Sequence, residues 1–253
     1  RGLKSLGITT PVVGSAAVLS EQMTLNEVKA SILPDLAVRY AKLGQPAEAM
    51  SLILKAYQMA KGIKDSRLRM ELGLKIAQAY VDSKNGAEAE KLLANLRSDA
   101  AHLADLQFQA QALAEIADTH GKMKQYGQSL AVIKEIKDPQ IAVIAYLSLA
   151  DLIKSSGSSQ DIVPLIADAS AAARQIGDGN SRDDAFCRIA FRYADEGKFN
   201  EALQHVAQTA NAGIRAFALA HTGAVAAKAQ YASTPEDRAM IRDIMKSQQV
   251  RQK

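Results

Sequence analysis

The residues that most often carry out chemistry are sparse in this chain of 253 residues. It contains a single cysteine, Cys187, which excludes an intramolecular disulfide and a paired-thiolate metal site. Cys187 lies near Phe186 and Ile189, so we expect a small buried side chain and not a nucleophile. The histidines lack the i, i+4 pair and adjacent glutamate of a zinc protease; they are His102, His120, His205 and His221. The sequence therefore predicts no metal centre.

Three further patterns that can support catalysis or nucleotide binding are incomplete. The Gly-Asp-Gly sequence at residues 177–179 lacks the later glycine and the lysine of a phosphate-binding loop, so we interpret it as a turn. The serines within residues 155–159 have no strand–turn–helix context for a nucleophile elbow. The acidic pair at residues 183–184 falls at an expected helix start, where the helix dipole accounts for it. We therefore expect no enzymatic activity and no cofactor.

Positive charge is in slight excess and is not concentrated. The chain has 31 Lys and Arg against 27 Asp and Glu, a net charge of +4, without the dense stripe that phosphate recognition favours. One basic position recurs seven residues before a repeated aliphatic residue, as Arg69, Arg182 and Arg215. In a repeat protein such positions lie in a line that could bind phosphate or an acidic peptide. Gln109 and Ala142 interrupt the line, which favours a structural role at the helix starts.

The elements that position these side chains follow from a repeated fragment. In each copy an aliphatic residue (the anchor) is followed directly by a small residue, usually alanine. A tyrosine, histidine or isoleucine stands three positions after the small residue, and a glycine follows in most copies. The anchors are Leu36, Ile76, Ile116, Leu149 and Ile189, with a fainter copy at Thr222. The steps between them are 40, 40, 33, 40 and 33 residues. Such periods are typical of stacked helical pairs, so the sequence predicts an all-α solenoid of about six antiparallel pairs.

The two repeat lengths differ by seven residues, which is about two turns of α-helix. The second helix of a pair has room for about 18 residues at 46–64, 86–105 and 158–177. It has room for only about 12 to 14 residues at 126–137 and 199–213. We therefore expect the long repeats to have long second helices.

Local signals predict several helix boundaries. Asp138 before Pro139 combines a side-chain acceptor with a residue suited to the first helical position. Ser181 and Thr234 each stand three residues before an aspartate, which is the layout of an N-cap near the positive end of a helix. Pro34 lies inside the first helix of the first repeat, so we expect a break near residue 33 and a separate short helix over residues 25–31.

Three regions follow from these boundaries. Residues 1–30 are expected to form a lead-in or cap, and residues 31–230 the repeat array. Residues 231–253 are expected to form a capping helix and tail, because residues 235–249 alternate apolar and charged side chains with helical spacing.

The first repeat resembles a tetratricopeptide repeat (TPR) in its spacing of large, small and aromatic positions. Those positions are Leu36, Ala37, Tyr40, Gly44, Ala49, Ile53 and Ala56. The fifth repeat follows the same pattern, with Ile189, Ala190, Tyr193, Gly197, Phe199, Ala202 and Val206. The second has Lys84 at the glycine position, and the third and fourth are degenerate, with His120 and Ile153 at the aromatic one. The resemblance covers about residues 31–230 and implies a right-handed superhelix of antiparallel pairs.

The resemblance also implies where a partner would bind, because in the TPR family the first helices form most of the concave surface. The positions two residues past the anchors give Gln78, Asp118, Asp151 and Phe191 as groove candidates. With Val38 in the same row the groove is mixed in character, and it lacks the repeated lysine, arginine and asparagine of a clamp for a terminal carboxylate. We expect a protein or peptide segment held mainly by shape and apolar contact.

The resulting hypothesis is a non-catalytic protein-interaction scaffold, and two alternatives remain. One is a structural subunit that self-assembles or belongs to a larger complex, with the apolar segment at residues 2–19 as the candidate contact. The lesser alternative is a helical-repeat RNA binder, which the uneven repeat step disfavours because a one-base-per-repeat code needs an even step. The apolar stretch at residues 6–19 is too short for a membrane span. The compartment stays open, with the cytoplasm preferred over the periplasm or an organelle lumen.

Overall fold

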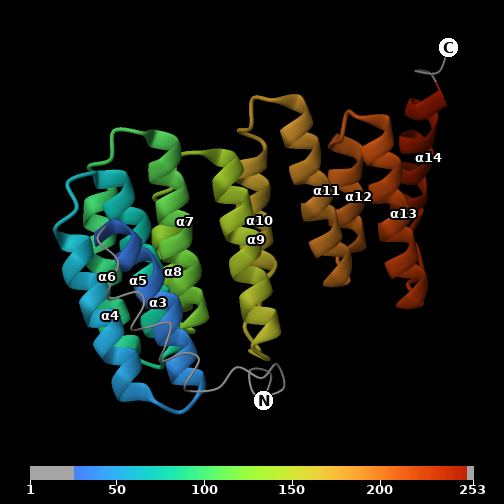
Figure 1. Cartoon of the computed structure of the whole chain (residues 1–253). Coiled ribbons are helices and arrows are strands. Elements are labelled where there is room, and N and C mark those ends of the chain that lie inside the picture. The colour runs from blue at the N-terminus through green and yellow to red at the C-terminus, as the bar shows by residue number, and fades with distance from the viewer. Residues whose placement is uncertain (1–25, 250–253) are drawn as a thin grey trace. The chain divides into compact units, whose positions relative to one another are not determined.

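The computed structural model describes residues 26–249, and over this range the regular secondary structure consists of twelve α-helices joined by turns and loops (Figure 1). It divides into two compact units, residues 1–135 and 136–253, here called the N-terminal and C-terminal units. The helices of the N-terminal unit are α3 (Asn26–Lys42), α4 (Pro46–Lys61), α5 (Ser66–Asp82), α6 (Gly86–Ala100), α7 (Leu106–Lys122) and α8 (Tyr126–Ile133). Those of the C-terminal unit are α9 (Pro139–Ser155), α10 (Val163–Ala173), α11 (Gly179–Asp195), α12 (Phe199–Gln208), α13 (Ala212–Lys228) and α14 (Pro235–Gln249).

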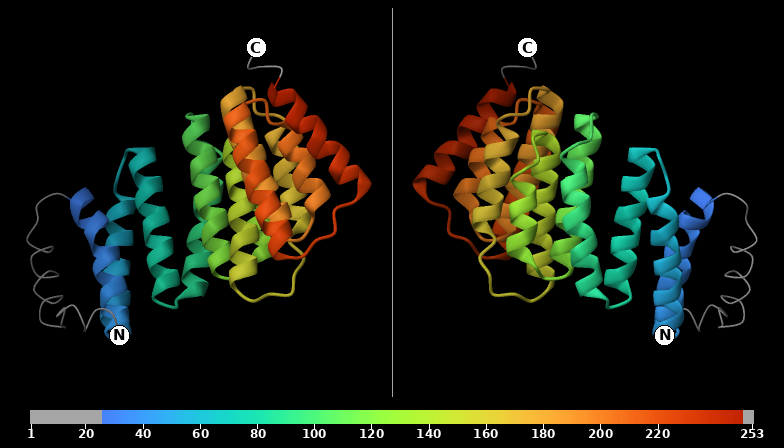
Figure 2. Two further views of the ribbon diagram at one scale, coloured as in Figure 1. Left: turned by 90° about the vertical axis from the view of Figure 1, so that its right-hand side faces the viewer. Right: turned by 90° about the vertical axis from the view of Figure 1, so that its left-hand side faces the viewer.

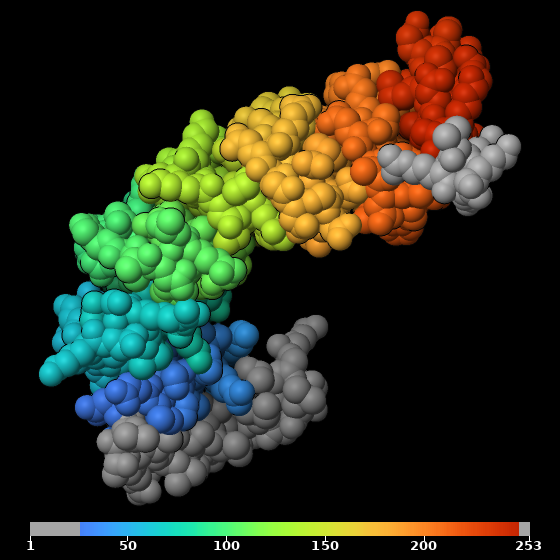
Figure 3. Space-filling view, turned by 90° about the horizontal axis from the view of Figure 1, so that it is seen from above, coloured from blue at the N-terminus to red at the C-terminus, as the bar shows by residue number. Residues whose placement is uncertain are grey.

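Each unit is built from TPR-like helix pairs, as the repeated fragment predicts. In the N-terminal unit α3 pairs with α4, α5 with α6, and α7 with α8, and the first helices α3, α5 and α7 pack side by side (Figure 2). The surface of this unit runs in chain order from blue to green (Figure 3). In the C-terminal unit α9 pairs with α10 and α11 with α12, α13 packs against α11 and α12, and α14 lies against α12. The division into three regions at residues 30 and 230 stays a prediction.

The repeated small residue explains how the pairs pack. The alanine after each anchor is at most 1% exposed in five repeats, at Ala37, Ala77, Ala117, Ala150 and Ala190. A methyl side chain at this point lets two helices approach closely, and the large anchor beside it fills the space between successive pairs. The anchors Ile76, Ile116 and Ile189 are accordingly fully buried. The stacking of pairs therefore supplies the core of each unit.

Two of the predicted helix starts are confirmed and one is wrong. Asp138 accepts hydrogen bonds from the N–H groups of residues 140 and 141. Thr234 and Asp237 cap each other reciprocally, at 3.1 and 2.8 Å. Helix α11 begins at Gly179 and not after Ser181, because the carboxylate of Asp178 accepts from the N–H of Ser181 at 2.7 Å and caps the helix earlier. The segment interpreted as a turn at residues 177–179 therefore leads into that helix, with Asp178 as its N-cap and Gly179 as its first residue.

Two other expectations are also wrong. Helix α3 runs without interruption through Pro34, so no separate helix forms over residues 25–31. Pro34 is buried against the neighbouring helices, and this packing outweighs the missing backbone donor. In the fourth repeat the second helix α10 has only 11 residues, because Pro164 stands in its first turn and the polar residues 158–161 form a loop. The long second helices expected of the first two repeats are present, with 16 and 15 residues.

Candidate functional site

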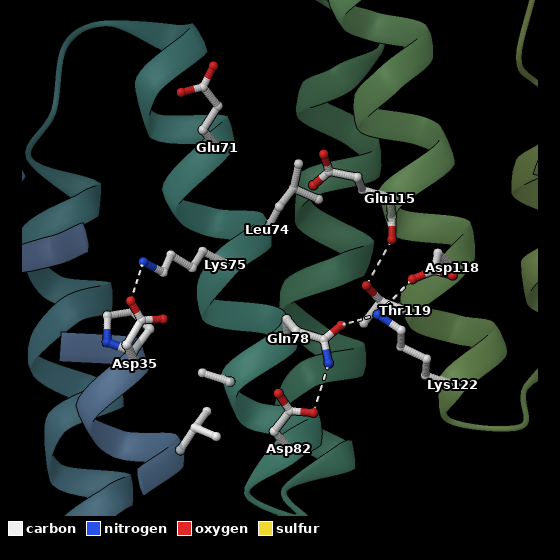
Figure 4. Close-up of a pocket in the computed structure, with 13 residues that line it drawn as sticks. Asp35, Glu71, Leu74, Lys75, Gln78, Asp82, Glu115, Asp118, Thr119 and Lys122 are labelled. Atoms are coloured by element: carbon white, nitrogen blue, oxygen red, sulfur yellow. Dashed lines mark hydrogen bonds and ion pairs between the residues drawn. The ribbon is translucent and has the colours of Figure 1, made fainter. Parts of the chain in front are cut away.

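A groove of about 400 Å³ lies in the N-terminal unit, on the faces of α3, α5 and α7 (Figure 4). We call it the first-helix groove. Its charged lining residues are Asp35, Glu71, Lys75, Asp82, Glu115, Asp118 and Lys122. Its uncharged lining residues are Pro34, Val38, Leu74, Gln78, Ala79 and Thr119.

Helical spacing places these side chains together. On α5 the lining residues Glu71, Leu74, Gln78 and Asp82 are separated by three or four positions and so share one face. Ile76 falls outside this face and is buried in the stack. Each first helix thus uses one face for the core and turns another towards the groove.

A network of polar contacts crosses the groove from helix to helix. The ammonium group of Lys75 lies 2.8 Å from the carboxylate of Asp35, which joins α5 to α3. Gln78 accepts a hydrogen bond from Lys122 of α7 at 3.1 Å and donates one to Asp82 at 2.9 Å. Lys122 also pairs with Asp118 at 2.8 Å. Both lysines of the groove are therefore engaged by groups of the groove itself (Figure 4).

The groove is acidic. Five carboxylates and two ammonium groups line it, which gives a net charge of −3. Of these carboxylates Glu71 has a cation from outside the lining, since Arg67 of the same helix lies 3.1 Å away. Burial raises the pKa of the Glu115 carboxyl, the negative charges of Asp118 and Glu71 raise it further, and the charge of Lys122 opposes them. The groove therefore holds more negative charge than its own lysines compensate.

The four predicted groove residues fall in two places. Gln78 and Asp118 line the first-helix groove. Asp151 lies in the C-terminal unit, where both its carboxylate oxygens accept hydrogen bonds from Arg192, at 2.8 and 2.7 Å, and join α9 to α11. Phe191 of α11 packs against the ring of Phe217 of α13, with the centroids 5.5 Å apart. Gln78 and Asp118 therefore lie together in one groove, whereas Asp151 and Phe191 each contact the next first helix of the C-terminal unit.

The recurring arginines share one geometry. Each donates from Nη1 to the backbone carbonyl oxygen six residues earlier in the chain, in the segment that follows the preceding second helix. The pairs are Arg69 with Ile63 at 2.6 Å, Arg182 with Ile176 at 3.3 Å and Arg215 with Thr209 at 3.2 Å. At the interrupted position Gln109 donates in a similar way to the carbonyl oxygen of Ala100, at 2.9 Å. These contacts stabilise the loop before each first helix, and ligand binding by this line stays a prediction.

Most of the charge in the groove lies outside the positions two residues past the anchors, which predicted a groove of mixed character. The acidic lining comes from the neighbouring positions on the same helix face, such as Asp35 and Glu115 directly before an anchor and Asp82 six residues after one. Extending each candidate by three or four residues along its helix would have found them.

The buried chemical groups elsewhere are part of the core. Cys187 is 6% exposed, as expected of a packed residue, and burial raises the pKa of its thiol. Ser170 Oγ lies 2.6 Å from Nε2 of His205, whose Nδ1 lies 2.7 Å from the carbonyl oxygen of Glu201. Both side chains are buried, so a substrate does not reach this pair. Within residues 26–249 no cluster of His, Cys, Asp and Glu suits a metal ion, and no helix is both long and apolar enough to cross a bilayer.

Comparison with known proteins gives structural neighbours. No protein-family model matches the chain, and no curated protein matches it. Ton1535 from Thermococcus onnurineus NA1 is 14% identical over 84% of each chain, with a TM-score of 0.40. A putative kinesin light chain from Podosopora anserina with nearly identical TPR-like repeats is 20% identical over 83% of this chain and 100% of that chain, with a TM-score of 0.46. A variant of that kinesin light chain is 19% identical with the same coverage and TM-score. These values are low, and the TPR-like architecture described above rests on the helix pairs themselves.

Proposed function

We propose that this protein is a non-catalytic interaction scaffold that holds a segment of a protein partner in the first-helix groove. TPR-like folds commonly mediate protein–protein interactions. The observation that carries the proposal is the groove itself, a concave face of α3, α5 and α7 that includes the predicted residues Gln78 and Asp118.

The groove suits an extended segment. Neighbouring packed helices lie about 8–10 Å apart, so three first helices span about 20 Å between the outer axes. An extended chain advances about 3.3 Å per residue, and about six residues cross that distance. The contacts of Lys75 with α3 and of Lys122 with α5 connect the three helices across the groove. A preformed surface of this kind needs little ordering when a partner binds.

Peptide selection on the purified protein tests the proposal. A random peptide-display library is panned against the parent protein, and the dissociation constants of selected peptides are measured for the parent and for Gln78→Trp, which fills the groove. Lys91→Trp, an exposed change on the second helix α6, is the matched control. We expect Gln78→Trp to weaken binding about tenfold or more and the control to leave it unchanged. Selection of no peptide, or of peptides indifferent to Gln78→Trp, contradicts the proposal.

A further inference from the structure

We infer that the segment held in the first-helix groove is basic and places a lysine or arginine side chain between Glu71, Glu115 and Asp118. This inference rests on the proposed function, since it names the chemistry of the partner at the same groove. It replaces the expectation of a segment held mainly by apolar contact.

The groove's own cations already have partners within the protein. Lys75 is engaged by Asp35 and by the carbonyl oxygen of Ser31. Lys122 is engaged by Asp118 and Gln78. Neither ammonium group is left over for an acidic ligand. With Arg67 paired to Glu71 from outside the lining, two negative charges of the groove remain in excess. Charge complementarity therefore favours a cationic occupant.

Glu115 lies beside other negative charges in the groove. Its neighbours in the groove include Asp118, and both Asp118 and Glu71 destabilise its charged form. Within residues 26–249 the structure shows no ion pair or hydrogen bond to the Glu115 carboxylate. The Glu115 side chain is exposed to solvent and lies among like charges, so an added cation can reach its carboxylate and relieve that repulsion.

The lining of the groove also favours one kind of cation. The described residues offer no cluster that would coordinate a metal ion, so the excess charge favours an organic cation on a flexible side chain. Lysine and arginine carry their charge on long stems, and these stems can cover Leu74 and Val38, which also line the groove. A basic segment thus matches both the charge and the apolar part of the lining.

The test uses defined peptides and two matched variants of the full chain. The probes are a labelled peptide of about six residues that alternates lysine and arginine with alanine, and its glutamate counterpart. Fluorescence anisotropy is measured at low and high salt. The groove variant is Glu71→Gln/Glu115→Gln, and the control is Glu48→Gln/Glu88→Gln, which makes the same charge change on the second helices α4 and α6.

We expect the basic peptide to bind the parent and the glutamate peptide not to bind. The groove variant should lose about tenfold in affinity, the control should stay within about twofold, and salt should weaken binding to the parent most. An equal loss in the control variant would show unspecific attraction and overturn the inference. If the selected library peptides were neutral or acidic and their binding were lost in Gln78→Trp, the inference would be overturned and the proposed function would stand. Binding of every peptide unchanged by Gln78→Trp would overturn both.

Discussion

At the scale of single residues, the turn that ends each first helix shows how one backbone geometry is met by different side chains. Gly44, Gly157 and Gly197 adopt φ values of 81°, 70° and 71°. Lys84 and Lys124 occupy the equivalent turns with φ of 61°. A residue with a Cβ is strained in this left-handed region, whereas glycine is not. The repeat therefore tolerates the strain where the packing of the pair maintains the turn.

Replacing Lys84 by glycine should stabilise the protein. Relief of the strained φ should raise the free energy of unfolding by about 0.5–1 kcal/mol, after subtraction of the entropy that glycine adds to the unfolded chain. Urea unfolding followed by circular dichroism measures the change. The control Lys91→Gly, at an exposed position inside α6, should cost about 1 kcal/mol instead. A loss of stability in Lys84→Gly would show that the lysine side chain itself supports the turn.

Acid should destabilise the protein through His205. Burial lowers the pKa of this imidazole in the folded state from the ordinary value of 6.5, and the hydrogen bond to Glu201 only partly opposes it. The unfolded chain therefore binds the proton first, and the stability contributed by neutral His205 is present above about pH 6.5 and is lost as the pH falls below it. Urea unfolding between about pH 8 and 5 should show a smaller fall for His205→Gln than for the parent. The same pH dependence of the free energy of unfolding in both proteins would exclude His205 as the cause.

At the scale of elements, contacts between successive first helices recur in both units. Asp35–Lys75 joins α3 to α5, and Asp151–Arg192 joins α9 to α11, at 2.8 and 2.7 Å. These pairs are largely exposed, so each contributes only about 0–1 kcal/mol to stability. Their effect is to set the register in which the helix faces meet. The arginine contacts to the preceding loop add a second, more buried connection at the same helices.

Arg215 offers the sharpest test of that connection. It is 4% exposed and donates to the carbonyl oxygen of Thr209, while its Nε and Nη2 find no partner among the described residues. Truncation in Arg215→Ala should cost about 2–4 kcal/mol, because it leaves a cavity and a buried carbonyl oxygen without its donor. Arg215→Met should cost less, since it keeps most of the volume and removes the unpaired donors. Thermal or urea unfolding measures both.

Arg188→Ala is the control for this comparison. Arg188 lies in the same unit and pairs with Asp184 through two side chains that are each 58% exposed. Its removal should change the free energy of unfolding by less than about 0.5 kcal/mol. If Arg215→Ala lowered the free energy of unfolding no more than Arg188→Ala does, the contact of Arg215 with the carbonyl oxygen of Thr209 would not contribute to stability.

At the scale of the whole molecule, the two compact units present different first-helix surfaces. The N-terminal unit carries the acidic groove. In the C-terminal unit Phe217 of α13 is 63% exposed and lies against Phe191, so the corresponding helices offer an aromatic surface. Helix α14 adds Ile244 to a core cluster that contains Cys187 and Val206. This packing supports the predicted capping role of α14, which stays a prediction.

Light scattering separates the scaffold from the self-assembling alternative. The mass of the purified chain is measured with and without residues 1–25, a deletion that stops before α3 begins at Asn26. The proposed function expects a monomer in both cases, because the partner segment comes from another protein. A defined oligomer that dissociates on deletion would favour the structural-subunit alternative and make the groove secondary.

The parts of this structure that depend on neighbours in the chain could be predicted from the sequence. The aliphatic–alanine pairs and their spacing predict the helix pairs, and Asp138 and Thr234 predict helix starts, because helical periodicity and capping act over a few residues. These inferences need only one helix at a time. Gln78 and Asp118 were groove candidates for another reason, because the resemblance to tetratricopeptide repeats implies that the first helices line a groove.

Only the tertiary structure decided the rest. Asp35, Lys75, Glu115 and Lys122 are separated by up to 87 positions along the chain, and their common groove exists because three helices stack in one register. Helix α3 continues through Pro34 because the burial of its apolar residues stabilises the helix more than the proline destabilises it. The net charge of the groove comes from side chains on three different helices, so no local sequence pattern predicts it.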